Sequence, residues 1–232
     1  MRIFDKNRIT DVFFDLDHTL WDFEKNSLLT FKKIFNFLDI KISLSNFIKT
    51  YRPINLEFWK LFRENKISRD ELRNERLRLT FLKLNVKIDD HQIVKISDMY
   101  LKYLTSFSFL HEGTFDLLNF LKKKYSLHII SNGFEEIQKR KVINSGLYKF
   151  FDNIFTSEVI GYKKPNPKIF HFVLNKVNIK PVSAVMIGDS KEADIMGALN
   201  IGLNAIHFNS NNEKNHDLCV IVRSLKEIKN YL

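Results

Sequence analysis

The feature that most constrains this chain is a short apolar run that ends abruptly in acidic side chains. Residues 12–16 (VFFDL) have a pattern typical of a buried strand. Side chains two positions apart on a strand point the same way, so we expect Asp15 and Asp17 to project together from its carboxyl end. Open parallel α/β sheets bind their ligands at that edge. Two like charges this close favour a bound cation or a shared proton. The alternative is a polar strand end with Thr19 in a turn.

Length and composition limit the class of protein. A chain of 232 residues fits one large domain, or one domain with an insertion. No apolar run approaches the roughly 20 residues of a membrane span, and residues 1–10 carry charges where a signal peptide would have an apolar core. The single cysteine, Cys219, cannot form an internal disulfide. We therefore expect a protein of the reducing cytoplasm that does not act at a membrane.

The net charge of +10 indicates anionic partners. Nucleic acid would be one such partner, but the 37 Lys and Arg residues are spread from Arg2 to Lys229, and no nucleic-acid-binding motif accompanies them. A dispersed surplus of lysine is typical of a solvated surface. We therefore interpret the charge as compatible with a small phosphorylated substrate and as little support for nucleic-acid binding.

Between the first strand and about residue 127 the apolar spacing is helical. The apolar residues recur at intervals of three and four, which predicts amphipathic helices. Their stripes are Leu28, Phe31, Phe35 and Leu38; Phe58, Leu61 and Phe62; Leu77, Phe81 and Leu84; and Ile93, Ile96, Tyr100, Leu104 and Phe107. Ser68 with Glu71 has the form of a capping box, and Asp89 can cap the last helix. Four such helices predict a small bundle that covers the acidic motif as a cap. We assign residues 21–107 to this cap domain, and residues 1–20 with 108–232 to an α/β core domain.

From residue 111 the pattern changes to strands that alternate with helices. Strands are predicted at about 127–130, 154–156, 184–187 and 205–208, and helices at about 113–124 and 135–146. A third helix is expected to begin at Pro167 with Asn166 as its cap. The polar run 209–216 is predicted to be a loop. This alternation favours a Rossmann-like α/β fold with a parallel sheet.

Unusual polar side chains follow several of these predicted strands. Ser131 and Asn132 end one strand, Asp189 ends another with Asp194 shortly after it, and Lys164 lies in an intervening loop. Taken singly, Ser131 and Asn132 could form only a turn. Lys164 could be a solvated lysine, Asp189 a helix cap and Asp194 a surface residue. Together they favour a single crevice at the carboxyl edge of the sheet.

The order of these residues resembles the four motifs of the haloacid dehalogenase-like (HAD) hydrolase superfamily. The motifs are Asp15-Leu16-Asp17-His18-Thr19, Ser131-Asn132-Gly133, Lys164-Pro165, and Gly188-Asp189-Ser190 followed by Ala193-Asp194. The long gap between the first two motifs is similar to that of the helical-cap class. Residues 17–23 (DHTLWDF), 131–138 (SNGFEEIQ) and 157–170 (SEVIGYKKPNPKIF) resemble in particular the YjjG/YfnB group, whose bacterial members include nucleotidases.

The resemblance implies phosphoryl-transfer chemistry that requires Mg²⁺. Asp15 would be the nucleophile that forms an aspartyl-phosphate, and Asp17 the general acid and base. Asp15, the main-chain carbonyl of Asp17, and Asp189 would hold the metal ion. Asp17 also distinguishes the reaction, because the true dehalogenases of the superfamily lack an acid/base Asp at this position.

Other motif residues have supporting roles by the same resemblance. Lys164, Ser131 and the main-chain N–H of Asn132 would bind the phosphoryl oxygens, where charge-assisted hydrogen bonds are strongest. Thr19 would orient the nucleophile loop. Asp194 would either join the metal shell or position Lys164.

The implied substrate is a small phosphorylated metabolite, with a pyrimidine or noncanonical nucleoside 5′-monophosphate as the leading candidate. Trp21 and Phe23 could line the entrance and stack on a base or a sugar, or could simply fill the core. A sugar-phosphate or phosphoglycolate phosphatase and a phosphomutase are alternatives of the same class. A nucleic-acid-associated protein without turnover is the alternative of a different class. The sequence leaves the oligomeric state, monomer or dimer, open.

Overall fold

A computed structural model describes residues 4–210 and 212–232. The chain divides into two compact units: the described residues up to Phe23 join Ser108–Leu232, and Glu24–Phe107 form the other unit. Trp21 and Phe23, which the sequence pattern assigns to the cap, fall within the first unit. The chain there pairs with the returning segment, because Trp21 forms an antiparallel bridge with Leu110 and the Asp22 N–H donates to the Phe109 carbonyl over 3.0 Å.

The first unit is built on a six-stranded sheet in which every strand pair is parallel. The strands, in their spatial order, are β3 (Asn153–Thr156), β2 (Ser126–Ser131), β1 (Asp11–Phe14), β4 (Ala184–Gly188), β5 (Asn204–Phe208) and β6 (Val220–Val222). The chain moves outward from β1 in one direction through β2 and β3, and in the other through β4 to β6. The strand order therefore reverses beside β1, where α/β sheets place their ligand sites. The predicted parallel sheet is confirmed.

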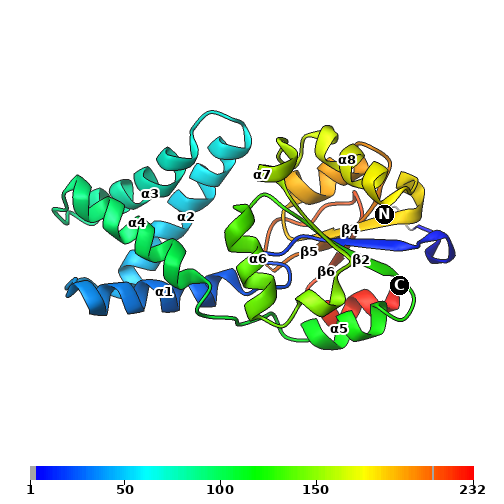
Figure 1. Ribbon diagram of the computed structural model, residues 1–232, viewed down its shortest axis with the longest axis horizontal. Coiled ribbons are helices and arrows are strands. Elements are labelled where there is room, and N and C mark those ends of the chain that lie inside the picture. The colour runs from blue at the N-terminus through cyan, green and yellow to red at the C-terminus, as the bar shows by residue number, and fades with distance from the viewer. Residues whose placement is uncertain (1–3, 211) are drawn as a thin grey trace. The chain divides into compact units, whose positions relative to one another are not determined.

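All four residues of β1 are buried, as expected for a parallel strand covered on both faces. The helices of this unit are α5 (Thr114–Leu121), α6 (Glu135–Asn144), α7 (Ser157–Ile160), α8 (Pro167–Val177) and α9 (Gly197–Leu199). Figure 1 shows α8 on one face of the sheet and α5 on the other. One apolar cluster joins Phe13 and Met186 of the sheet to Phe170 and Val173 of α8.

Several short elements were not predicted. The strand β6 and the helix α7 are too short for a periodic pattern, and a π-helix spans Lys191–Met196 before α9. The long helices agree better with the sequence: Asn166 caps α8 by accepting from the Lys168 N–H, and Pro167 is its first residue.

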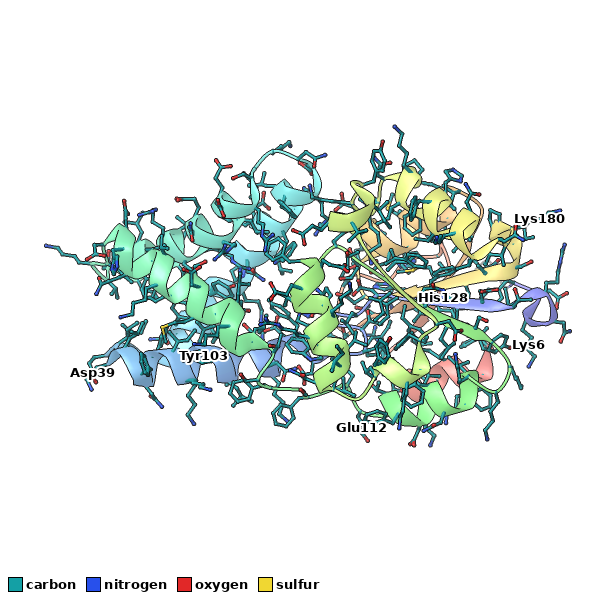
Figure 2. All side chains as sticks on the ribbon, in the orientation of Figure 1. Lys6, Asp39, Tyr103, Glu112, His128 and Lys180 are labelled. Carbon is teal, nitrogen blue, oxygen red and sulfur yellow. The ribbon has the colours of Figure 1, made fainter. Side chains whose placement is uncertain are left out.

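A buried contact between two side chains joins β1 to β2. His128 lies on β2 (Figure 2), with its Nε2 2.9 Å from Asp11 Oδ1 on β1.

The second unit is the all-α insertion that follows β1, and its four helices are consistent with the predicted bundle. These are α1 (Phe23–Leu38), α2 (Leu44–Arg63), α3 (Arg69–Lys83) and α4 (Asp90–Leu104). Ser68 with Glu71 and Asp89 with Gln92 both form capping boxes. No helix among the residues described here combines the length and apolar character that crossing a membrane requires.

The core of this bundle is aromatic, and it differs from the predicted stripes in α1 and in α2. In α1, Leu28 of the predicted stripe is exposed. Phe31 packs against Phe47 and Tyr100, with ring centroids 4.8 and 4.7 Å away. In α2 the predicted stripe of Phe58, Leu61 and Phe62 is only half-buried. The buried side chains of α2 lie earlier, and they include Phe47, Tyr51 and Ile54. The half-buried aromatic residues have helical spacing too, so periodicity alone did not separate the two sets.

Candidate active site

The polar side chains predicted to converge do so at the carboxyl ends of β1, β2 and β4. Asp15 follows β1, and its main-chain N–H donates to the Ile187 carbonyl of β4 over 2.9 Å. Ser131 ends β2, and Asp189 follows β4. Parallel strands bring these ends to the same edge of the sheet. We call these side chains, together with Lys164 and Asp194, the cluster. The strand order brings its residues together, although they lie far apart in the sequence.

Lys164 is the electrostatic centre of the cluster. Its side chain is 2% exposed, and its Nζ lies 2.7 Å from Asp15 Oδ1, 2.6 Å from Asp194 Oδ1 and 2.6 Å from the Ile130 carbonyl oxygen. The ammonium group donates hydrogen bonds to Asp15 Oδ1 and to the Ile130 carbonyl oxygen, and it forms an ion pair with Asp194. Burial opposes the charged form, but Asp15 and Asp194 outweigh it and raise the pKa of Lys164 above its usual range.

Asn132 holds the main chain of the same lysine. Its Nδ2 donates to the Lys164 carbonyl over 2.9 Å, and its Oδ1 accepts from the Lys164 N–H over 2.8 Å. Ser131 Oγ, buried beside it, accepts from the Gly133 N–H. The side chain of Asn132 therefore fixes the loop that carries Lys164, a role that sequence reasoning did not assign.

Asp194 is placed by the π-helix and by the absence of a side chain at Gly188. Its Oδ2 accepts from the Ser190 N–H over 3.0 Å while Oδ1 faces Lys164. A Cβ at Gly188 would lie 2.3 Å from Asp194 Oδ2, so only glycine permits this close approach. His207 of β5 supports the neighbouring main chain, because its Nε2 lies 2.8 Å from the Asp189 carbonyl oxygen.

Three carboxylates of this cluster could hold a metal ion. Asp15, Asp189 and Asp194 each offer one oxygen within 4.8 Å of the others, and oxygen ligands of this kind suit a hard divalent cation. Burial raises the pKa of Asp15 to about 7, although Lys164 opposes the shift. Burial also raises the pKa of Asp189 well above its usual value, and the negative charges of Asp15 and Asp194 add to this effect. The carboxylates present therefore fit a cation, whose charge would offset their burial and repulsion.

The carboxylate of Asp17 is held by two residues of α6 to which sequence reasoning gave no role. Lys141 Nζ lies 2.6 Å from Asp17 Oδ1, and Gln138 Nε2 donates to Asp17 Oδ2 over 2.8 Å. The spacing of these two residues in the sequence could have indicated that they lie near the cluster. Gln138 and Lys141 are three positions apart in a helix that begins directly after the Ser131-Asn132-Gly133 turn, so they share one face near the cluster.

Three other predicted site residues are buried away from solvent. Thr19 Oγ1 is buried and has no hydrogen-bond partner within the described part of the chain, so no hydrogen bond from this hydroxyl orients the nucleophile loop there. Trp21 has no exposed surface, and Phe23 is 8% exposed. Their predicted stacking on a substrate stays a prediction, and their burial weighs against it.

The fold and the ordered motifs together define a hydrolase family. The chain belongs to the haloacid dehalogenase-like hydrolases, because the model of that family matches residues 11–202. This range contains Asp15, Asp17, Lys164, Asp189 and the other residues of the cluster. The family that the sequence motifs resemble is thus confirmed.

Individual relatives narrow the comparison. The HAD-hydrolase YfnB of Bacillus subtilis (strain 168) is 31% identical over 90% of this chain and 87% of its own. Pyrimidine 5′-nucleotidase YjjG of Escherichia coli (strain K12) is 28% identical over 88% of this chain and 87% of its own. A glyceraldehyde 3-phosphate phosphatase of Methanothermobacter thermautotrophicus is 32% identical over 94% of this chain and 98% of its own.

Comparison with solved structures leads to the same group. The crystal structure of YfnB from Bacillus subtilis bound to magnesium matches this chain with a TM-score of 0.87 at 28% identity. The match covers 96% of this chain and 98% of the YfnB chain. The resemblance to the YjjG/YfnB group is therefore confirmed at the level of sequence and of fold.

Proposed function

We propose that this protein is a Mg²⁺-dependent phosphomonoester hydrolase that acts through an aspartyl-phosphate on Asp15. The observation that carries the proposal is the buried ammonium of Lys164, which lies within 2.7 Å of Asp15 and 2.6 Å of Asp194 at the edge of the sheet. A fixed positive charge beside a carboxylate nucleophile is what phosphoryl transfer to that carboxylate needs.

Asp15 is the proposed nucleophile. An oxygen of its carboxylate attacks phosphorus in line, a new O–P bond forms, and the bond from phosphorus to the leaving oxygen breaks. The ion pair with Lys164 favours the ionised form of Asp15 and so opposes the effect of burial, which raises the pKa of this carboxyl to about 7. A divalent cation held by Asp15, Asp189 and the main-chain carbonyl of Asp17 would supply the countercharge that lets an anion approach the cluster.

Asp17 is the proposed general acid and base. It gives a proton to the leaving oxygen when the P–O bond breaks, and later takes a proton from the water that attacks the aspartyl-phosphate. The second step breaks the bond to Asp15 and releases inorganic phosphate. The side chain of Asp17 is 23% exposed, so it can reach a substrate at the edge of the sheet.

The transferring phosphoryl group is proposed to be bound by Lys164, Ser131 and the main-chain N–H of Asn132. Asp194 is assigned to the positioning of Lys164, since one of its oxygens faces that ammonium while the other is held by the Ser190 N–H. Its place in the metal cluster is compatible with this role, because each carboxylate oxygen has two lone pairs and can therefore accept from a second partner.

The proposed substrate is a nucleoside 5′-monophosphate, supported by the similarity to the pyrimidine 5′-nucleotidase YjjG over 88% of this chain. A triose or other sugar phosphate is the second candidate. It is favoured by the relative named a glyceraldehyde 3-phosphate phosphatase, which is 32% identical over 98% of its own length.

A panel assay tests the proposal. Phosphate release is measured with nucleoside 5′-monophosphates, sugar phosphates, phosphoglycolate and 4-nitrophenyl phosphate, in Mg²⁺ and in EDTA. We expect hydrolysis that requires Mg²⁺ and is abolished by Asp15→Asn, with a preference for one substrate class. Absence of hydrolysis on the whole panel, including the activated aryl phosphate, would overturn the proposal and leave the mutase or non-catalytic alternatives.

A further inference from the structure

Two side chains on one face of α6 contact the carboxylate of Asp17. Lys141 Nζ lies 2.6 Å from Oδ1, and Gln138 Nε2 lies 2.8 Å from Oδ2. Each oxygen therefore has its own donor, which fixes the plane of the carboxylate as well as its position. A carboxyl oxygen has a second site for a proton or a hydrogen bond, so both contacts are compatible with proton transfer to and from a substrate.

The burial of the two partners differs. The side chain of Asp17 is 23% exposed, whereas that of Lys141 is 2% exposed. The ammonium of Lys141 lies 4.3 Å from the centroid of the Trp21 ring and 5.6 Å from that of Phe23. Aromatic faces stabilise a cation at such distances. Lys141 thus lies between buried rings and the partly exposed carboxylate, where it can hold Asp17 without itself facing solvent.

Gly133 gives Gln138 its route to Asp17. A Cβ at Gly133 would lie 1.6 Å from Gln138 Nε2 and 2.6 Å from its Cδ. The amide of Gln138 therefore crosses directly over the main chain of Gly133. The glycine of the Ser131-Asn132-Gly133 turn leaves open the space through which this side chain passes.

We propose that Lys141 and Gln138 are positioning residues that hold Asp17 in the orientation needed for proton transfer, with Trp21 as the support of Lys141. This inference rests on the proposed function, because it concerns the acid and base of that reaction. It gives Trp21 a role in the interior of the unit in place of substrate stacking.

The test compares two aryl phosphates that differ in leaving group. The leaving group of 4-nitrophenyl phosphate departs readily, whereas that of phenyl phosphate depends more on protonation. The value of kcat/KM is measured for each, because it reports the steps up to phosphoryl transfer to Asp15 and not the hydrolysis that both substrates share. The variants are Lys141→Met, Lys141→Arg and Gln138→Leu. Lys139→Met is the matched control, since Lys139 lies on the same helix and pairs with Glu135 at the surface.

We expect Lys141→Met to lower kcat/KM for phenyl phosphate by roughly 10- to 100-fold and that for 4-nitrophenyl phosphate by less than about 3-fold, since a general acid contributes about 100- to 10,000-fold. Gln138→Leu should show the same selectivity to a smaller degree. Lys141→Arg should recover much of the loss, because a guanidinium can donate to Asp17 and stack on Trp21. Lys139→Met should match the wild type on both substrates.

If Lys141→Met and Gln138→Leu lower kcat/KM equally for both substrates, or lower it for neither, the inference is overturned. The wild-type rates would still support the proposed function in that case. Crystal structures of the wild type and of Lys141→Met provide a readout that needs no activity. We expect the Asp17 carboxylate to change its side-chain rotamer in the variant. If it keeps its position without Lys141, the inference is wrong, whatever the wild type hydrolyses. If Lys141→Met does not fold, Gln138→Leu decides by the same two criteria.

Discussion

Replacement of Gly188 by alanine is expected to damage both stability and activity, because Gly188 lies directly against Asp194. A Cβ at this position would lie 2.3 Å from Oδ2, 2.4 Å from Cγ and 2.6 Å from Cβ of Asp194. Non-bonded carbon atoms prefer separations of about 3.5–4.0 Å, so the overlap exceeds about 1 Å. Asp194 is buried, with 1% of its surface exposed, so the added atom meets a side chain in the interior.

The size of the effect follows from what Asp194 must give up when it shifts. Overpacking in a filled interior costs about 1–3 kcal/mol. The contact of Asp194 with Lys164 at 2.6 Å and the hydrogen bond from the Ser190 N–H at 3.0 Å are both weakened, and a hydrogen bond to a charged group contributes about 1.5–3 kcal/mol. We therefore expect the free energy of unfolding to fall by about 3 kcal/mol. A shift of Lys164 by about 1 Å should lower kcat/KM by up to about 100-fold.

Urea unfolding and hydrolysis of 4-nitrophenyl phosphate measure the two effects. Gly202→Ala is the control, since Gly202 has φ of +81° but the nearest atom to an added Cβ, the Cβ of Pro181, lies 3.9 Å away. It should lose only about 1–2 kcal/mol of stability through backbone strain and keep its kcat/KM. The reasoning is refuted if Gly188→Ala unfolds and hydrolyses like the wild type, or if Gly202→Ala loses as much activity.

Three further predictions concern the acidic residues. Asp15→Asn should abolish turnover with a wild-type circular dichroism spectrum, and residual hydrolysis would remove Asp15 as the nucleophile. Asp17→Asn should lower kcat/KM for phenyl phosphate far more than for 4-nitrophenyl phosphate; equal losses would contradict its role as the acid. Burial raises the pKa of Asp15 from 3.8 to about 7, so at intermediate pH the folded protein retains a proton that the unfolded chain has released. In EDTA, the urea midpoint should therefore fall as pH rises from about 4 to about 7, less steeply in Asp15→Asn, and a pH-independent difference between the two proteins would be inconsistent with this shift.

The placement of the acidic and polar residues at one edge of the sheet was predictable from local patterns. The apolar run that ends at Asp15 and the later strands that end at Ser131 and Asp189 are visible in the sequence, and parallel strands bring their carboxyl ends to one edge. The helical insertion was predictable for a similar reason, because its spacing, the capping box at Ser68 and the cap at Asp89 are local signals.

The burial of individual aromatic side chains was not predictable in the same way. Trp21 follows the acidic motif closely enough to suggest the entrance of a site, yet it has no exposed surface. In α2, Phe58 and Phe62 repeat with the same helical spacing as Phe47 and Tyr51, but only the latter pair is buried. Periodicity defines the face of a helix, whereas burial depends on which neighbour covers it.

By itself, the sequence determined the order of the longer strands and helices, the family to which the chain belongs, and the acidic residues at the strand ends. These features depend on spacing along the chain. The tertiary structure alone decided the partners of those residues: Lys164 reaches Asp15 across 149 positions, and Lys141 reaches Asp17 across 124. The strand order sets such contacts, together with the face that α6 turns towards the sheet. A lysine that holds a carboxylate and a lysine in solvent therefore look alike until the chain is folded.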